Sequence, residues 1–403
     1  MPASPSTARA INDRLALSLL QQEGPLTAGQ LKQLTGLSRP TVADLVERLT
    51  DAGLITVVGE SGEQRRGPNA RLYGIVADRA HLAALDVRTE GVLVLVSDLV
   101  GRVLAEASVP IGDDAGTGPA VEQAVAAVER AVKEAGADRL HTVGIGAPGL
   151  IDPATGDLRD SAGLPAWHRS LAAALPERLS GARVTVENET NLAALAEQRE
   201  GAARDRDTFV LLWLGHGVGA AVVLDGTLRR GASGGTGEIG FLPVPGTGSL
   251  PSATDCAGGL HSLTGAAAIA SLAAECGLPA PAAADGTGVA AVVRNAVTAQ
   301  ARAARPTEAP GAQRFLRTLA DRIAVGAASV VAVLDPGCVV LGGEIGRAGG
   351  ETLAGLVARR LRRMSPLPTE VRPSGLGGTA VLRGALLTAR DRAQDELFAP
   401  PER

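Results

Sequence analysis

The sequence has few cysteines, no long apolar run and no recognisable export signal. Its three cysteines, Cys256, Cys276 and Cys338, are scattered and odd in number, so they predict no disulfide framework and favour a reducing compartment. No stretch approaches the ~18 consecutive apolar residues that a membrane-spanning helix needs. The first ten residues lack the charged and then apolar pattern of a secretory signal. We therefore expect a cytoplasmic protein with no membrane span.

Lysine is also scarce, since it occurs only at Lys32 and Lys133, whereas arginine is abundant. This imbalance, together with much alanine and glycine, is typical of a GC-rich coding bias, so arginine abundance alone predicts no function. The formal net charge is −4 over 403 residues. A chain of this length has room for two or three domains. Because the whole chain is not a polycation, any nucleic-acid binding must come from a local surface.

The N-terminal region, residues 9–77, has the pattern of three helices followed by a β-hairpin. Thr27 caps a short second helix that ends near Gly36, and Ser38 caps a third helix. Apolar residues at helical spacing mark the first and third helices: Ile11, Leu15 and Leu19 in the first, and Val42, Leu45, Val46 and Leu49 in the third. Two β-rich runs around a Gly- and Arg-rich loop follow. This order predicts an N-terminal winged helix-turn-helix, all-α with a β wing, after a disordered tail at residues 1–8.

The exposed face of the third helix and the wing predict contact with DNA. Polar and arginine side chains near a helix start can reach base edges in a major groove, whereas wing arginines suit phosphates or a minor groove. The predicted DNA-binding residues are Thr27, Ser38, Arg39, Thr41, Arg48, Arg65, Arg66 and Arg71, and Asp44 shares the helical face. Residues 1–80 hold 9 Lys and Arg against 8 Asp and Glu, a net of +1, and the remainder holds 30 against 35, a net of −5. The alternative is a protein-interaction module with a solvated charged face.

Residues 80–395 repeat one order of elements: a meander of strands, a helix, a strand and a further helix. The first meander covers residues 81–109 and is followed by a helix over roughly 119–136, and the second meander covers residues 208–231. One strong strand is predicted over 338–343. The repetition predicts a duplicated α/β fold with a cleft between two lobes.

Polar residues gather where the segment VENETN (186–191) joins a strand to a helix. Glu187, Asn188, Glu189 and Asn191 lie there at the carboxyl end of the strand, which is where open α/β sheets bind ligands. Three roles stay open for Glu189: a catalytic base, a ligand contact without chemistry, or a relic that only hydrogen-bonds its neighbours.

Motifs over nearly all of residues 80–395 point to one family. They are Asp86 with DLVG (98–101), GIGAPGLIDPATG (144–156), VENETN, GHGVGAAVVLDG (215–226), GEIG (237–240) and LDPGCVVLGG (334–343). In these motifs the chain resembles the ROK family of sugar kinases and repressors, which has a two-lobed actin/hexokinase-like (ribonuclease H-like) fold. A winged helix in front resembles the family's transcription-factor branch, whose members respond to sugars.

Several positions that the family's kinases need are altered. The resemblance places Glu189 where the kinases have a catalytic Asp, and a carboxylate displaced by about 1 Å can cost ~10²-fold in rate. Arg88 stands where a glycine of the first phosphate turn lets the backbone approach phosphate. The second turn, Gly215-His216-Gly217, lacks the hydroxyl of the usual Gly-Thr-Gly. We therefore expect no kinase activity and no cofactor.

The family's zinc site, one His with three Cys, is also altered. Phe241 stands at the His position, and the segment after it offers only Cys256 and His261, which cannot close a four-ligand site. We expect no metal, with Phe241 buried in an apolar turn and Cys256 packed as a small residue.

The resemblance implies effector contacts from Asn188, Glu189 and Glu238. Gly163 and Leu260 stand where many members have polar sugar contacts, and with Phe241 they make the pocket less polar. Each lost polar contact is worth ~1–3 kcal/mol, so binding of an ordinary hexose is expected to be abolished or retuned. His168 and His261 are expected to be structural.

These observations predict a DNA-binding transcriptional regulator, a repressor, whose degenerate kinase-like domain senses a sugar-like effector. Its expected partners are a double-stranded DNA operator and a second copy of the chain, as a homodimer or tetramer. Two alternatives stay open: an active ATP-dependent sugar kinase that also binds DNA, and a DNA-binding scaffold that needs no ligand.

Overall fold

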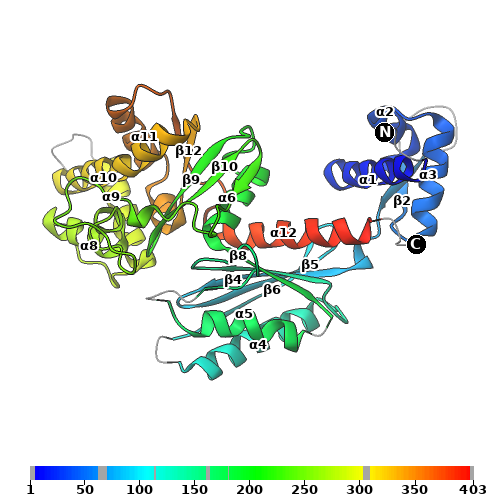
Figure 1. Ribbon diagram of the computed structural model, residues 1–403, viewed down its shortest axis with the longest axis horizontal. Coiled ribbons are helices and arrows are strands. Elements are labelled where there is room, and N and C mark those ends of the chain that lie inside the picture. The colour runs from blue at the N-terminus through cyan, green and yellow to red at the C-terminus, as the bar shows by residue number, and fades with distance from the viewer. Residues whose placement is uncertain are drawn as a thin grey trace.

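The computed structural model consists of a small N-terminal domain and two larger lobes (Figure 1). It describes residues 5–61, 70–112, 115–159, 164–179, 181–302 and 309–399. Within these ranges no helix is long and apolar enough to cross a membrane.

The N-terminal domain packs three helices on a three-stranded sheet of order β1-β3-β2. The elements are α1 (Pro5–Glu23), β1 (Leu26–Thr27), α2 (Ala28–Thr35), α3 (Arg39–Asp51), β2 (Ile55–Ser61) and β3 (Ala70–Ile75). As predicted, Thr27 caps α2, Gly36 ends it and Ser38 caps α3; the structure adds a capping box between Thr27 and Gln30 and a left-handed conformation at Gly36. The predicted apolar stripe of α3 is buried.

Helix α1 differs from the prediction in its start and in its buried face. It begins at Pro5, so residues 5–8 are helical where a disordered tail was predicted. Its buried side chains include Leu17 and Leu20, whereas Ile11 is 58% and Leu15 is 40% exposed. Apolar residues surround this helix on several sides, so its periodicity does not select one face. Packing against the rest of the chain determines which face of α1 is buried.

The first lobe is a five-stranded sheet of order β6-β5-β4-β7-β8, antiparallel from β6 to β4 and parallel from β4 to β8. Its elements are η1 (Ala77–Arg79), β4 (His81–Arg88), β5 (Gly91–Asp98), β6 (Val103–Pro110), α4 (Thr117–Glu134), β7 (Thr142–Ala147), α5 (Trp167–Arg178) and β8 (Arg183–Asn188). Alternate residues of β4 divide between two cores: Leu85 packs with α4 and α5, and Leu82 packs in the core that includes α12 (Ala380–Leu397).

The second lobe repeats this plan with a sheet of order β11-β10-β9-β12-β13. Its strands are β9 (Phe209–Leu214), β10 (Val218–Leu224), β11 (Thr227–Arg229), β12 (Cys338–Gly342) and β13 (Glu370–Pro373). Its helices are η2 (Ile239–Phe241), α7 (His261–Thr264), α8 (Ala266–Glu275), α9 (Gly286–Arg302), α10 (Pro310–Leu334) and α11 (Gly343–Met364). The predicted duplication of an α/β unit is confirmed.

Helices α6 (Glu189–Glu200) and α12 connect the lobes and pack closely on each other. Gly384 of α12 meets the backbone of Leu192 so tightly that an added Cβ would lie 2.0 Å from the Leu192 carbonyl oxygen. The fully buried carboxylate of Glu197 accepts hydrogen bonds from the Ala202, Gly375 and Leu376 N–H groups and from the Ser374 hydroxyl. Glu197 therefore ties the end of α6 to the segment that leads towards α12, through η4 (Gly377–Thr379).

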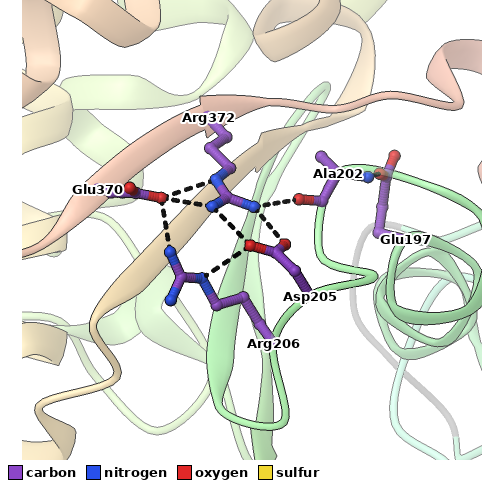
Figure 2. Close-up of polar contacts among 6 residues, drawn as sticks. All are labelled: Glu197, Ala202, Asp205, Arg206, Glu370 and Arg372. Carbon is purple, nitrogen blue, oxygen red and sulfur yellow. Dashed lines mark hydrogen bonds and ion pairs between the residues drawn. The ribbon is translucent and has the colours of Figure 1, made fainter.

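An ion-pair network continues this link into the second sheet (Figure 2). Arg372 of β13 donates to the Ala202 carbonyl oxygen at 2.8 Å and pairs with Asp205 and Glu370. Arg206 pairs with the same two carboxylates. The turn after α6 is thus fixed to the edge strand of the second lobe.

The C-terminal end of α12 contacts the N-terminal domain (Figure 1). Gln394 Nε2 donates to Gln21 Oε1 of α1 at 2.7 Å and to the Leu99 carbonyl oxygen at 3.0 Å. Arg14 of α1 forms an exposed ion pair with Asp395. Leu17 and Leu20 belong to the same hydrophobic cluster as Leu82 of the first lobe and buried residues of α12. The N-terminal domain is therefore packed on the body of the protein, not merely tethered to it.

Candidate ligand site and DNA-binding surface

Charged and polar residues from both lobes come together near the carboxyl ends of β4, β8 and β12. We call this group the inter-lobe site: Asp86, Arg88, Asn188, Glu189, Glu238 and Glu344. Their proximity is seen in the pKa of Glu189, which burial raises to about 8, with further upward contributions from the charges of Asp86, Glu238 and Glu344. A carboxyl group with this pKa is partly protonated at neutral pH, so it can either donate or accept a hydrogen bond.

Asn188 holds the start of α6 and has no free amide donor. Its Oδ1 accepts from the Thr190 and Asn191 N–H groups and caps the helix. Its Nδ2 donates to the Gly149 carbonyl oxygen at 3.0 Å and to Glu189 Oε2 at 3.3 Å. A ligand that uses Asn188 must therefore replace one of these bonds.

Glu238 is the more accessible member of the predicted effector set. It is exposed just before η2, and its carboxylate makes no hydrogen bond or ion pair with any described residue. Glu187, by contrast, is engaged by Asn191 and by Arg230 at 2.6 Å. Glu187 therefore supports the local structure, whereas Glu238 is free to meet a ligand.

Arg88 fills the first phosphate turn with a side chain. Its guanidinium donates to Asp86 Oδ2 from Nη2 at 2.6 Å and from Nε at 2.9 Å, and to the Gly378 carbonyl oxygen at 3.0 Å. Asp86 is buried, and burial raises the pKa of its carboxyl group while the charge of Arg88 opposes that shift. The arginine that replaces the expected glycine is thus bonded inside the protein.

Glu344 fills the second phosphate turn, although it was not among the residues predicted from the sequence. A Cβ atom added to Gly215 would lie 2.5 Å from Glu344 Oε2, and a Cβ atom added to Gly286 would lie 3.3 Å from the same oxygen. Burial raises the pKa of Glu344, while a hydrogen bond from its own backbone and the charge of Arg88 lower it. The signal was available, since the acid directly follows the matched segment LDPGCVVLGG.

The segment after η2 differs from the prediction at two residues. Phe241 was predicted to be buried, but it is 37% exposed because η2 ends there at the surface. Leu260 was predicted to line the effector pocket, but it is buried in the core of the second lobe against Gly326. Leu260 therefore does not line the inter-lobe site.

Cys256 and His261 line a cavity of about 390 Å³ beside this segment. Asp255 and small residues complete its wall, and in the described part of the chain no three His, Cys, Asp or Glu residues are placed to hold a metal ion. One Cys and one His do not fit the family's zinc, which needs four ligands. Cys256 is partly exposed at this cavity, so it is less packed than predicted.

His168 has the structural role that the sequence predicts. It is 2% exposed, lies edge-on to Trp167, and its Nε2 is 3.2 Å from the Arg88 carbonyl oxygen. Burial lowers the pKa of its imidazole to about 4, so the ring is neutral at physiological pH. Gly163, at the other predicted contact position, lies outside the described residues.

Two predicted DNA contacts are already used inside the N-terminal domain. Thr27 is only 8% exposed, and its hydroxyl is paired with Gln30 in the capping box. Arg48 pairs with Asp13 of α1 at 2.5 Å and also with Asp44. Thr27 caps a helix and Arg48 joins α1 to α3, so both side chains have structural roles, and their contact with DNA stays a prediction.

The remaining predicted residues are more accessible. Arg39 and Ser38 are exposed at the start of α3, and Thr41 is partly exposed with its hydroxyl 2.7 Å from that of Ser38. Arg71 is exposed on β3. Arg65 and Arg66 lie outside the described residues. The start of α3 and the strand β3 thus present polar and basic groups to solvent.

The chain matches the ROK family over residues 83–392. This span covers both lobes. The chain belongs to the ROK family. Residues 11–67 also match the MarR family, in agreement with the predicted winged helix. The predicted combination of a winged helix with a two-lobed actin/hexokinase-like domain is confirmed.

Two relatives of this ROK protein are named as regulators. It is 25% identical over 240 residues to the xylose repressor of Caldicellulosiruptor bescii, covering 59% of each chain. It is 26% identical over 246 residues to the DNA-binding transcriptional dual regulator NagC of Escherichia coli, covering 59% of this chain and 58% of NagC. The chain thus spans less than two thirds of the length of either relative.

Solved structures of both regulators and kinases share the fold. A ROK family transcriptional regulator described as a homologue of the E. coli MLC protein has a TM-score of 0.74 at 21% identity, over 97% of this chain and 98% of that one. The ROK hexokinase from Thermus thermophilus has a TM-score of 0.61 at 29% identity, over 78% of this chain and 99% of that one. The regulator therefore matches the N-terminal domain as well, whereas the hexokinase matches a smaller share of the chain.

Proposed function

We propose that this ROK protein is a DNA-binding transcriptional repressor without kinase activity, whose inter-lobe site binds a sugar-like effector. The observation that carries this proposal is a winged helix packed on a kinase-like body in which Arg88 and Glu344 occupy the two phosphate turns. The proposed domain limits are residues 9–77 and 80–395. We expect it to act in the cytoplasm.

The DNA-binding surface is formed by Ser38, Arg39 and Thr41 at the start of α3, with wing arginines that include Arg71. Side chains at the start of a recognition helix reach base edges, and wing arginines hold phosphates. Two protomers, in a dimer or a tetramer, present two such helices one or more DNA turns apart to a palindromic operator.

Helix α12 couples the effector to the operator. It follows Gly378, whose carbonyl oxygen accepts from Arg88, and it ends against Gln21 of α1. At 18 residues it is roughly 27 Å long. Effector binding by Glu189 and Glu238 changes the closure of the lobes, and α12 passes that change to the winged helix as a population shift. The coupling needed is ~1–3 kcal/mol.

The DNA-binding part is tested with fragments selected from the source genome. Arg39→Ala lowers discrimination between operator and random DNA in a gel-shift assay, whereas Arg130→Ala, an exposed arginine on α4, leaves it unchanged. Equal affinity of wild type and Arg39→Ala for every fragment would refute the recognition-helix assignment.

The effector part is tested by thermal-shift screening against sugars and phosphosugars. A shift that is lost in Glu238→Gln supports the pocket, because Glu238 has no structural bond to lose. The absence of a thermal shift with every compound of a broad panel supports a scaffold that binds DNA without a ligand.

An active sugar kinase is the second candidate, favoured by the likeness to the Thermus hexokinase and by the pKa of Glu189, which suits a general base. A coupled assay with ATP, Mg²⁺ and hexoses decides between them. Steady turnover that disappears in Glu189→Gln would establish the kinase.

A further inference from the structure

Glu344 occupies a place that suits a phosphate group. It lies in the first turn of α11, where the N-cap, Gly342, offers no side chain to the free N–H groups, and the helical backbone is interrupted further along at Gly350 (φ 49°, ψ −149°). The free N–H groups of a helix start attract negative charge. Here the carboxylate of Glu344 supplies the negative charge.

The surrounding backbone approaches this carboxylate closely. Gly215 and Gly286 lie so near to one Glu344 oxygen that a Cβ on Gly215 would clash with it. Gly286 also approaches the His216 N–H, where its added Cβ would be 2.8 Å away. Glycines let a backbone turn approach an anion closely because they have no side chain. At Gly215 the space that this leaves is filled by the carboxylate of Glu344.

We propose that Glu344 is a built-in anion that excludes phosphate groups from the inter-lobe site, so that the effector is an uncharged, hydroxyl-rich sugar and not a phosphorylated sugar or a nucleotide. This inference rests on the proposed function, whose effector it specifies.

The charges around Glu344 also disfavour the binding of a phosphate group. Arg88 is the basic member of the inter-lobe site, and its charge is already balanced by Asp86 at 2.6 Å. An incoming phosphate therefore meets the carboxylate of Glu344 without a free basic partner among the described residues, and the carboxylate of Glu238 lies on the same site. An uncharged sugar avoids this repulsion and can hydrogen-bond to the same carboxylates.

Pyrophosphate and Mg-ATP are the probes that test the proposal in the full-length protein. Trp213 lies beside the site, since a Cβ atom added to Gly215 would be 3.0 Å from its Nε1. Its fluorescence should therefore report binding there. Titration monitored by tryptophan fluorescence and calorimetry is expected to show no binding to wild type at about 1 mM. Glu344→Gln removes the charge but keeps the volume, and Glu344→Ala removes both. Each variant is expected to bind pyrophosphate about tenfold or more tightly than wild type.

Glu351→Gln is the matched control, since Glu351 is exposed on the same helix. It is expected to behave as wild type. Equal affinity of wild type and Glu344→Ala for pyrophosphate would overturn the proposal. So would unchanged affinity in both Glu344 variants, provided that circular dichroism shows at least one of them to be folded.

Failure of this inference can be told apart from failure of the proposed function. Operator binding and thermal shifts with uncharged sugars are measured on the same samples. Loss of those signals in wild type counts against the repressor, whereas a phosphosugar that binds wild type better than its unphosphorylated parent counts against Glu344 alone.

Discussion

Gln394 of α12 donates a hydrogen bond of 2.7 Å from Nε2 to Oε1 of Gln21 in α1, although 373 residues separate the two in the chain. Each amide also bonds to the backbone between β5 and β6: Gln394 to the Leu99 carbonyl oxygen and Gln21 to that of Val100. One small polar group of four partners thus fixes the winged helix, the first lobe and the C-terminal helix to one another.

Gln394→Ala should loosen the winged helix from the body. The change removes two hydrogen bonds and leaves Gln21 Oε1 without its donor, although Gln21 keeps its bond to the Val100 carbonyl oxygen, at a cost of ~1–2 kcal/mol. Scanning calorimetry should show the N-terminal domain melting earlier and separately from the lobes. Gln123→Ala, an exposed glutamine on α4, should leave the profile unchanged. Identical melting of Gln394→Ala and wild type would show that the contact does not couple the domains.

Arg48→Ala should affect stability and not the salt dependence of DNA binding. Its guanidinium pairs with Asp13, and the two side chains are 31% and 22% exposed. Loss of this half-buried pair should lower the free energy of unfolding by ~1 kcal/mol in urea titrations. The salt slope of operator binding should match that of wild type, because a bonded arginine releases no counterion. A slope reduced by about one would mean that Arg48 contacts phosphate after all.

Glu189→Gln should change how stability depends on pH. Burial raises the pKa of Glu189 to about 8, so the folded protein holds this proton more tightly than the unfolded chain does. Wild-type stability should therefore fall as pH rises from the ordinary glutamate range to about 8, and then level off. Glutamine cannot ionise, so the variant should match wild type near about pH 5 and exceed it by roughly 1–3 kcal/mol near about pH 8.5.

Urea unfolding at the two pH values measures this difference, with Glu47→Gln on the exposed face of α3 as the control. Parallel pH profiles for wild type and Glu189→Gln would contradict the shifted pKa.

Glu197→Ala should be strongly destabilising. The side chain is fully buried and is the acceptor for four donors, which would keep no partner in the variant. A cost of ~3–5 kcal/mol is expected. Glu200→Gln on the same helix breaks only an ion pair with Arg383, where the side chains are 32% and 50% exposed, and should cost less than ~1 kcal/mol. Chemical denaturation compares the two, and a similar small loss for both would show that Glu197 is not a structural anchor.

Local signals in the sequence were enough to predict most elements. Thr27, Ser38 and Gly36 act through their own neighbours in the chain, so the limits of α2 and α3 could be found from residue type and spacing. The strands of both meanders were equally clear, because their apolar runs are separated by tight turns. The family motifs then indicated how the two repeats are arranged in lobes.

Features set by distant contacts could not be predicted in this way. The buried face of α1 depends on α12, and the partner of Arg48 depends on how α1 crosses α3. Asn188 and Leu260 occupy motif positions, yet hydrogen bonds and packing within the fold decide whether they face a ligand. Glu344 directly follows a matched motif, and only its closeness to Gly215 in the fold shows that it occupies the second phosphate turn.

The close approach of Gly384 to Leu192 gives the two connecting helices a pivot with no side chain between them. Ten residues separate this pivot from Gln394, a distance of roughly 15 Å along the helix. A rotation of about 10° at the crossing therefore displaces the far end by roughly 3 Å, about the length of a hydrogen bond. A small angular change between the lobes is thus large enough to make or break the contact that seats the winged helix.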